Sequence, residues 1–108
     1  MNKNEDIQGI YIILNKTKST DDKLFVKIGS SKHCNKRYNE IRSSYRFNGM
    51  DDELELMRII PCVQNRKMER HAHLSLKAYR QTGEYFLVDK TKLEERINMI
   101  LNDINNYN

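Results

Sequence analysis

The sequence has few residues that break or cross-link a chain: one proline, four glycines, two cysteines and no tryptophan. Cys34 and Cys62 lack the spacing of a metal site, so we expect them to be reduced and to act as small buried hydrophobic residues. No apolar run approaches the ~18–20 residues of a membrane span, and no secretory signal follows Met1. We therefore expect an intracellular protein that is neither secreted nor in contact with a membrane.

The chain also lacks internal repeats and linkers. Its 108 residues suit one domain, which at this size buries roughly two-thirds of its unfolded surface and needs no disulfide. We expect this domain to span residues 9–104, with a loose segment at 1–8 and a frayed end at 105–108.

Hydrophobic periodicity predicts an α+β fold of order ββαβαβα, with a small, mainly antiparallel sheet of three strands plus a short extra strand, flanked by helices. The expected elements are strands at 10–14 and 24–28, helices at 32–47 and 65–80, a strand at 54–60, a short strand after a turn at Gly83, and a helix from Thr91.

Local signals predict where these elements begin and end. Gly29 is expected to stop the second strand, and Ser30 or Ser31 to cap the first helix. Thr91 and Glu94 form a capping box for the last helix. Its apolar stripe is either core or a dimer surface, and core packing is the favoured interpretation; the stripe comprises Leu93, Ile97, Ile100, Leu101 and Ile104.

The net charge of +4 favours a polyanionic partner, and its distribution is more informative than its size. One run of basic residues falls within 32–46 and a second within 66–80. Each run is either a solvated helix face or, together with the other, one side of a phosphate-binding groove. The residues assigned to nucleic-acid binding are Lys32, Lys36, Arg42, Arg46, Arg66, Arg70 and Arg80.

Strand alternation places Tyr11 and Lys27 on the same face of the first two strands. A phenol beside an ammonium group has a lowered pKa, which suits a general base. The alternative is a half-buried strand tyrosine with a lysine that points into solvent.

The two central helices add three polar groups. Helical periodicity places Arg37 at the edge of the apolar stripe of the first helix, where a guanidinium can bind a phosphate. Glu69 and His73 share a face of the second helix, either as metal ligands or as an ordinary surface pair. His71 and His73 diverge by about 200° and are not expected to share a metal.

Taken in order, these residues resemble the GIY-YIG nuclease superfamily. Gly9-Ile10-Tyr11 matches its first motif, and the residues from Val26 to Gly29 stand at its second. The stretch GSSKHCNKRY is similar to the helix start of phage homing endonucleases, with Arg37 at the position of the catalytic arginine. MERHAH supplies Glu69 as the metal-binding glutamate. The pairing of Glu69 with His73, followed by GEYF, is similar to the phage T5 ORF branch of viral and phage proteins.

The resemblance implies a metal-dependent endonuclease that hydrolyses phosphodiester bonds, with DNA as the expected substrate. It implies catalytic roles for Tyr11, Lys27, Arg37 and His73, and Glu69 as ligand of one Mg²⁺ or Mn²⁺ ion. Gly9, Gly29, Ser30 and Glu84 are expected to support the site. Lys27 stands where the family usually has a second tyrosine, as in some restriction endonucleases of the superfamily.

A viral or phage-type protein of this kind would act in the cytoplasm or nucleus of a host cell. Because 108 residues leave no room for a separate DNA-reading domain, a homodimer or a recruiting partner protein is also expected. Two other functions stay open: a nucleic-acid-binding module of the same fold that has lost cleavage, and a small protein-interaction domain.

Overall fold

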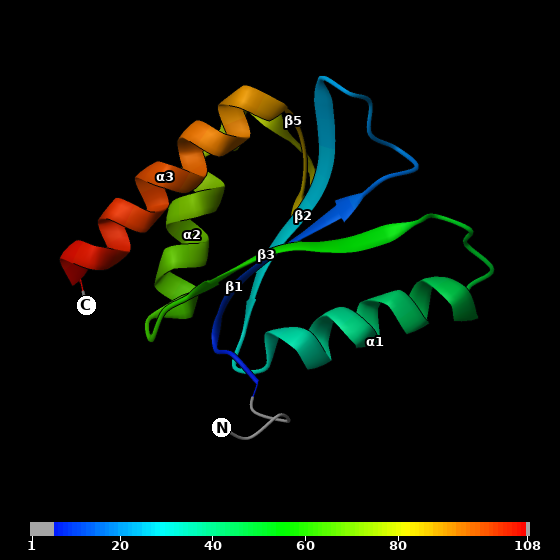
Figure 1. Cartoon of the computed structure of the whole chain (residues 1–108), viewed down its shortest axis with the longest axis horizontal. Coiled ribbons are helices and arrows are strands. Elements are labelled where there is room, and N and C mark those ends of the chain that lie inside the picture. Colours follow the sequence, from blue (N-terminus) through cyan, green and yellow to red (C-terminus); the bar gives the residue numbers. More distant parts are fainter. Residues whose placement is uncertain (1–5, 108) are drawn as a thin grey trace.

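The computed structural model describes residues 6–107 and has the expected α+β class, with a five-stranded sheet and three helices (Figure 1). The sheet is larger than the expected three strands plus a short one. The elements are β1 Gly9–Asn15, β2 Lys23–Ser31, α1 Cys34–Phe47, β3 Leu54–Pro61, α2 Asn65–Ser75, a 3-10 turn at Lys77–Tyr79, β4 Arg80–Thr82, β5 Tyr85–Asp89 and α3 Lys90–Tyr107.

The sheet has the strand order β3-β1-β2-β5-β4, and every neighbouring pair is antiparallel. β1 and β2 form the expected hairpin. The prediction that Gly29 stops the second strand is wrong, because β2 continues to Ser31 and pairs Gly29 with Tyr11. The additional strand β4 consists of three exposed residues, so no alternating apolar pattern marks it in the sequence.

Helix α2 ends at Ser75 and not at residue 80 as expected. Leu76 is fully buried, and the chain then turns through the 3-10 segment so that Arg80 pairs with Phe86 of β5. Residues 76–82 contain no glycine or proline that would break a helix. Strand pairing with β5 therefore decides the end of α2 here, in place of local propensity.

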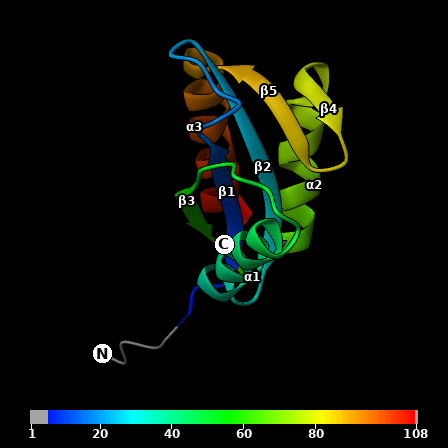
Figure 2. The ribbon, with the colours of Figure 1, turned by 90° about the vertical axis from the view of Figure 1, so that its right-hand side faces the viewer.

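The two faces of the sheet are covered by different helices (Figures 1 and 2). Helices α2 and α3 pack on the face that carries Ile10, Ile12, Val26 and Ile28. Helix α1 packs on the other face, in a smaller cluster that comprises Tyr11, Ile13, Cys34 and Ile41. Tyr11 and Lys27 lie on this second face, as strand alternation predicted.

The start of α1 differs from the expected one. The helix begins at Cys34 without a side-chain cap from Ser30 or Ser31. The carboxylate of Asp6 instead accepts hydrogen bonds from the backbone N–H groups of Asn35 and Lys36. A carboxylate from a distant segment thus satisfies donors that a local N-cap residue usually satisfies.

The segment before β1 is held in place from Asp6 onward. The carbonyl of Ile7 accepts from the N–H of Cys34, and that of Gln8 accepts from the N–H of Cys62. Residues 6–8 are therefore not loose, and residues 1–5 of the expected loose segment lie outside the described residues. Cys34 and Cys62 are free thiols and buried, and burial raises the pKa of Cys34 to about 11.

Helix α3 begins at Lys90, so Thr91 lies inside the first turn and does not cap it. The helix continues to Tyr107, three residues beyond the expected domain end. Its apolar stripe is core: Leu93, Ile97, Ile100 and Ile104 are buried, and Leu101 packs against them. This stripe is therefore not a free surface for a homodimer. In the described part of the chain, no helix is both long enough and apolar enough to cross a membrane.

Candidate active site at the open edge of strand β2

The candidate site lies where β2 loses one of its two neighbouring strands. Strand β5 pairs with β2 only from Lys23 to Lys27, and one further hydrogen bond joins the Ile28 N–H to the Glu84 carbonyl. Among residues 6–107, Gly29–Ser31 pair with β1 on one side and with no strand on the other. Side chains from both faces of the sheet can therefore meet at this edge.

Tyr11 reaches the edge because its partner in β2 is a glycine. A Cβ on Gly29 would collide with the hydroxyl and the ring of Tyr11, and it would lie 2.9 Å from Glu84 Oε1. The phenol therefore lies across the backbone of β2, in a notch that any other residue at position 29 would fill. Tyr11 is 2% exposed, so only a small part of its surface meets solvent.

Gly9 has a different reason to be a glycine. A Cβ at this position would collide with the carbonyl of Ile60 and lie 2.9 Å from the Cα of Pro61. Gly9 thus permits the close approach of β1 to β3. It supports the sheet on which Tyr11 stands and does not line the site.

Lys27 does not act on Tyr11 in the expected way. Its ammonium lies 3.0 Å from Glu84 Oε1 and 4.8 Å from the centre of the Tyr85 ring. The pKa of Tyr11 is raised to about 12, first by burial and then by the charge of Glu84. The expected lowering by Lys27 is wrong, because Lys27 is paired with Glu84 and the phenol lies in a buried site beside that carboxylate.

Arg37, in the first turns of α1, is the cation that does interact with the phenol. A hydrogen bond to Tyr11 and the positive charge both act to lower the pKa of Tyr11, although they do not overcome burial and Glu84. Its side chain is 48% exposed and lies 3.6 Å from Glu40. The guanidinium therefore has donors left for a phosphate group.

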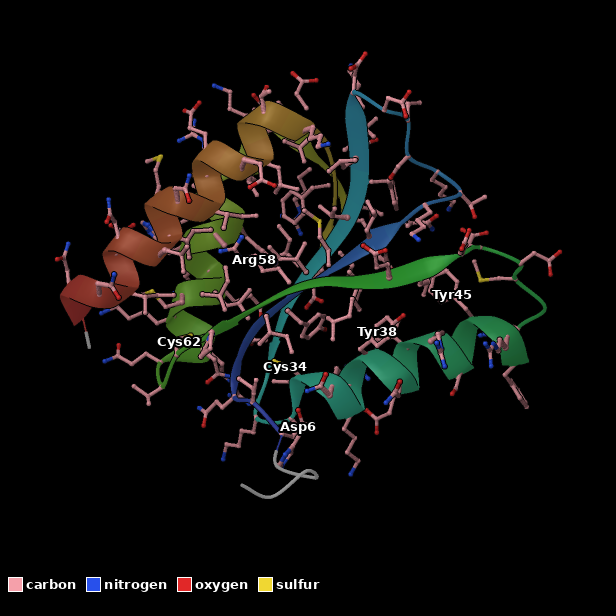
Figure 3. All side chains as sticks on the ribbon, viewed as in Figure 1. Asp6, Cys34, Tyr38, Tyr45, Arg58 and Cys62 are labelled. Atoms are coloured by element: carbon pink, nitrogen blue, oxygen red, sulfur yellow. The ribbon has the colours of Figure 1, made fainter. Side chains whose placement is uncertain are left out.

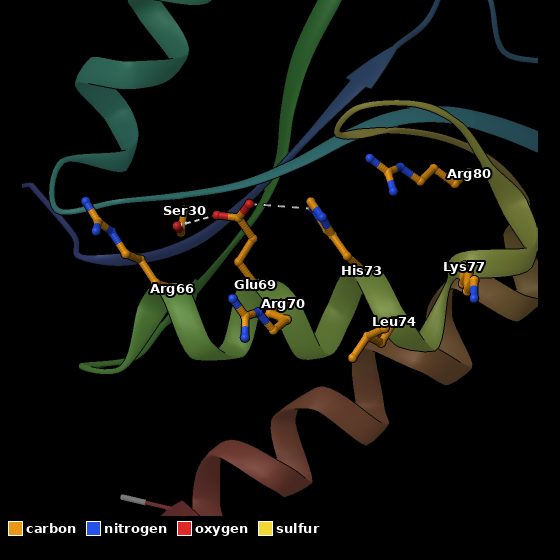
Figure 4. A pocket seen from close by; sticks show the side chains of 8 residues that line it. All are labelled: Ser30, Arg66, Glu69, Arg70, His73, Leu74, Lys77 and Arg80. Carbon is orange, nitrogen blue, oxygen red and sulfur yellow. Dashed lines mark hydrogen bonds and ion pairs between the residues drawn. The ribbon is translucent and has the colours of Figure 1, made fainter.

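Glu69 approaches the same edge from the opposite face of the sheet, on α2 (Figure 4). Its Oε1 accepts a hydrogen bond from the hydroxyl of Ser30, and its charge acts on the pKa of Tyr11. The side chain is 21% exposed. Tyr11, Arg37 and Glu69 thus come from β1, α1 and α2 to one stretch of β2.

His73 is oriented by the backbone of β2. Its Nε2 lies 2.8 Å from the carbonyl of Ile28 and 3.8 Å from Glu69 Oε2. A carbonyl only accepts, so Nε2 carries the hydrogen and donates it. This nitrogen therefore has no lone pair for a metal, and the arrangement favours a role in positioning Glu69.

The basic residues predicted to bind nucleic acid divide into two groups. Arg66, Arg70 and Arg80 line one groove along α2 with Lys77, Leu74 and Glu69 (Figure 4). Lys32 lines an adjacent hollow with Arg66. Arg80 also donates from Nε to the carbonyl of Gly83. These cations surround the acidic group of the site, as a phosphate-binding surface requires.

The second group lies on α1, away from this groove. The guanidinium of Arg42 lies 5.8 Å from the centre of the Tyr38 ring, whose hydroxyl donates to the carbonyl of Leu54 in β3, at the other edge of the sheet (Figure 3). Arg46 follows one helical turn later, and Lys36 is exposed on the same helix. Neither Arg42 nor Arg46 lines the groove along α2 or the adjacent hollow.

The donor set at Glu69 suits a hard cation with few protein ligands. In residues 6–107, no group of three or more His, Cys, Asp or Glu side chains is placed to hold a metal. Mg²⁺ is commonly bound by one or two carboxylates, with waters and substrate phosphate completing its shell. A single Glu69 carboxylate beside the Ser30 hydroxyl fits that pattern.

The fold and this site define an α+β domain with a tyrosine, an arginine and a glutamate near one sheet edge, with the glutamate in a basic groove. The chain belongs to the T5orf172 domain family, which it matches over residues 8–101. Membership suggests a nuclease-like or DNA-binding function. No curated protein and no solved structure matches the sequence.

Proposed function

We propose that the protein is a metal-dependent endonuclease of the GIY-YIG type that hydrolyses phosphodiester bonds in DNA. The observation that carries this proposal is the meeting of Tyr11, Arg37 and Glu69 at the open edge beside Gly29. They come from three elements and both faces of the sheet. Core packing has no need to bring a phenol, a guanidinium and a carboxylate together at one edge.

Each of these groups has a part in the hydrolysis. Tyr11 takes a proton from the attacking water. Arg37 donates hydrogen bonds to the non-bridging phosphate oxygens, where negative charge grows in the transition state. Ser30 and His73 hold the Glu69 carboxylate in place. When bound at Glu69, Mg²⁺ or Mn²⁺ would polarise the phosphate and stabilise the leaving 3′ oxygen.

The groove along α2 supplies binding without base recognition. Arg66, Arg70, Lys77 and Arg80 present cations to a sugar-phosphate backbone, which would pass beside Glu69 and Ser30 in the same groove. Such contacts carry no sequence information. We therefore infer modest sequence specificity, and any stricter choice of site would come from a partner protein or a second copy.

A second function is also supported: burial and Glu84 raise the pKa of Tyr11 from 10.0 to about 12, so the phenol ionises even less readily than an ordinary tyrosine. A protein of this family that binds DNA without cutting it would tolerate a tyrosine with a raised pKa at this position. Lys27 in place of a second tyrosine favours the same alternative.

Plasmid cleavage separates the two functions. Supercoiled DNA is incubated with the protein in Mg²⁺, in Mn²⁺ and in excess chelator, and a gel shift is measured in Ca²⁺ at several salt concentrations. Nicked or linear product in Mg²⁺ or Mn²⁺ but not in chelator supports the endonuclease. A salt-dependent shift without product in either metal supports the binding module, and absence of both excludes the two.

A further inference from the structure

The protonated state of Tyr11 raises a chemical problem for the proposed reaction. With its pKa at about 12, the phenol holds its proton at neutral pH. A neutral phenol that takes a proton from water must pass its own proton to another group. The structure contains a candidate for that group beside the phenol.

Three charged side chains influence Tyr11: Glu84, Arg37 and Glu69. Arg37 has only donors, so it cannot accept the phenolic proton. Glu69 comes from the other face of the sheet, accepts from Ser30 and is the carboxylate assigned to the metal. Glu84 is not assigned to the metal. Of the two carboxylates, it raises the pKa of Tyr11 more strongly.

Glu84 shares the notch above Gly29 with the phenol. Its Oε1 lies 2.9 Å from the point where a Gly29 Cβ would be, and the Tyr11 hydroxyl lies even nearer to that same point. A small rotation of either side chain, or one water molecule, therefore joins the hydroxyl to this oxygen. The backbone of Glu84 is fixed too, because its carbonyl accepts from the N–H of Ile28.

Lys27 holds the oxygen that faces Tyr11. The 3.0 Å ion pair from its ammonium is made to Oε1, the same atom that lies in the notch. The ammonium is itself placed over the ring of Tyr85, and the Tyr85 hydroxyl lies 3.3 Å from that of Tyr45. With 15% of its side chain exposed, Lys27 is held more firmly than a surface lysine.

We propose that Glu84 accepts the phenolic proton of Tyr11 while Tyr11 accepts a proton from the attacking water, and that Lys27 positions the accepting oxygen. The inference rests on the proposed nuclease function and names the residues that activate its water. Glu84 acts through Tyr11 and touches no substrate, so it is a positioning residue for the reaction.

The proton balance of the step is complete. One water proton moves to Tyr11 Oη, and the phenolic proton moves to Glu84. The water oxygen forms a bond to phosphorus as the bond from phosphorus to the 3′ oxygen breaks, and the leaving oxygen takes a proton from solvent. Glu84 then returns its proton to water, so the net reaction converts a phosphodiester and one water into a 5′ phosphate and a 3′ hydroxyl group.

The substitution Glu84→Gln distinguishes this relay from a purely electrostatic role of Glu84, because the two predict opposite changes in the cleavage rate at neutral pH. Gln removes the negative charge that raises the pKa of Tyr11. If Glu84 only opposed ionisation of the phenol, the variant would cut faster than wild type at neutral pH. If Glu84 accepts the proton, the variant loses activity although its phenol ionises more readily.

The experiment measures cleavage of supercoiled plasmid in Mg²⁺ from pH 6 to pH 10 for wild type, Glu84→Gln and Glu94→Gln. Glu94 is exposed on α3 and makes a matched control for the chemical change. We expect Glu84→Gln to be slower by on the order of 10²-fold near pH 7, and to recover towards pH 10 as the phenol ionises. Glu94→Gln should cut like wild type, and circular dichroism should show both variants folded.

A second measurement does not need cleavage. The ultraviolet absorbance of ionising tyrosines is titrated in each protein and in its Tyr11→Phe counterpart, and the difference gives the pKa of Tyr11. We expect this pKa to fall in Glu84→Gln. An unchanged value would show that the two side chains do not face each other, and would overturn the relay even if the enzyme is active.

The outcomes keep the relay and the nuclease distinct. Equal or faster cleavage by Glu84→Gln at pH 7 overturns the relay and leaves the nuclease function intact. Absence of cleavage by wild type in both metals overturns the nuclease function, and the relay with it. In that case a lowered pKa of Tyr11 in Glu84→Gln still establishes the contact between the two side chains.

Discussion

The phenol of Tyr11 occupies the space that a side chain on Gly29 would fill. The two residues are direct partners in the β1–β2 ladder, so their Cβ positions point to the same face. The motif that places Tyr11 in β1 and the motif that places Gly29 in β2 therefore express one structural requirement. Gly29 is required for the space that it leaves to Tyr11 and not for its backbone conformation, because its φ angle is not positive.

The substitution Gly29→Ala tests this relationship. The added methyl group collides with the ring end of Tyr11, which is packed under α1 and cannot move far. We expect the free energy of unfolding to fall by about 1–3 kcal/mol, as in other overpacked sites, and cleavage to be lost. Urea unfolding and the plasmid assay measure the two effects.

The double variant Gly29→Ala/Tyr11→Leu supplies the control. Leucine lacks the ring end that the methyl group meets, so much of the lost stability should return while cleavage stays absent. Equal destabilisation by Gly29→Ala in the presence and absence of the tyrosine would show that the glycine serves another contact.

The sequence predicts the parts of the fold that depend on local pattern. The α+β class, the β1–β2 hairpin and the faces of Tyr11 and Lys27 follow from alternation, which a strand imposes on every residue. The end of α2 and the presence of strand β4 do not follow from local pattern. Arg80 joins the sheet through pairing with Phe86, and the strand that it begins has no apolar residues. The cap of α1 cannot be predicted from local sequence either, because Asp6 lies 29 residues before Asn35.

The proximity of four expected site residues follows from the sequence, their roles stay a prediction, and their electrostatics differ from the expected ones. The sequence predicts Tyr11, Arg37, Glu69 and Glu84 as site residues; Tyr11 and Glu84 lie beside Gly29, and Arg37 and Glu69 act on the pKa of Tyr11. The prediction that Lys27 lowers the pKa of Tyr11 is wrong, because sequence spacing does not reveal that the Lys27 ammonium faces Glu84. Arg42 and Arg46 were likewise assigned to the groove on charge alone, whereas Arg42 lies over Tyr38.

Glu69→Gln is expected to abolish cleavage and to leave DNA binding unchanged. The amide oxygen still accepts from Ser30, so the local structure is kept, but a neutral amide is a poor ligand for Mg²⁺. Cleavage in Mg²⁺ and gel shifts in Ca²⁺ are compared with Glu94→Gln. Full activity of the Glu69 variant in Mg²⁺ would remove this residue from the metal site.

The groove along α2 is expected to bind DNA, and the outer side of α1 is not. Arg70→Ala should weaken binding at every sequence and reduce the slope of log affinity against log salt by about 1, since one phosphate contact is lost. Arg42→Ala removes the same charge over Tyr38 and should leave that slope unchanged. Fluorescence anisotropy over a range of salt concentrations measures both, and equal effects would mean that DNA does not follow the groove.

Tyr11 is expected to make stability depend on pH in the alkaline range. Its pKa is raised from 10.0 to about 12 in the folded protein, so its stabilising effect is complete below pH 10 and is lost as pH rises towards 12. The loss should reach about 1 kcal/mol by pH 11.

Urea unfolding from pH 8 to pH 11 tests this dependence in wild type and Tyr11→Phe. Burial also raises the pKa of Tyr45, so both proteins lose stability, and the Phe variant should lose less. The same alkaline dependence in both would mean that the Tyr11 phenol is not perturbed by burial and Glu84.

Lys27→Met tests the ion pair on which the position of Glu84 depends. Methionine keeps the unbranched length and the contact with Tyr85, so the fold should survive, but the ammonium that holds Glu84 Oε1 is gone. The unpaired charge of Glu84 should then raise the pKa of Tyr11 further. We expect slow cleavage at neutral pH, partial recovery at alkaline pH and unchanged DNA binding.

Lys23→Met is the matched control, because Lys23 is exposed on the same strand. If Lys27→Met cuts as well as Lys23→Met across the pH range, Lys27 has no part in placing Glu84, and the accepting oxygen is held by the Glu84 backbone alone.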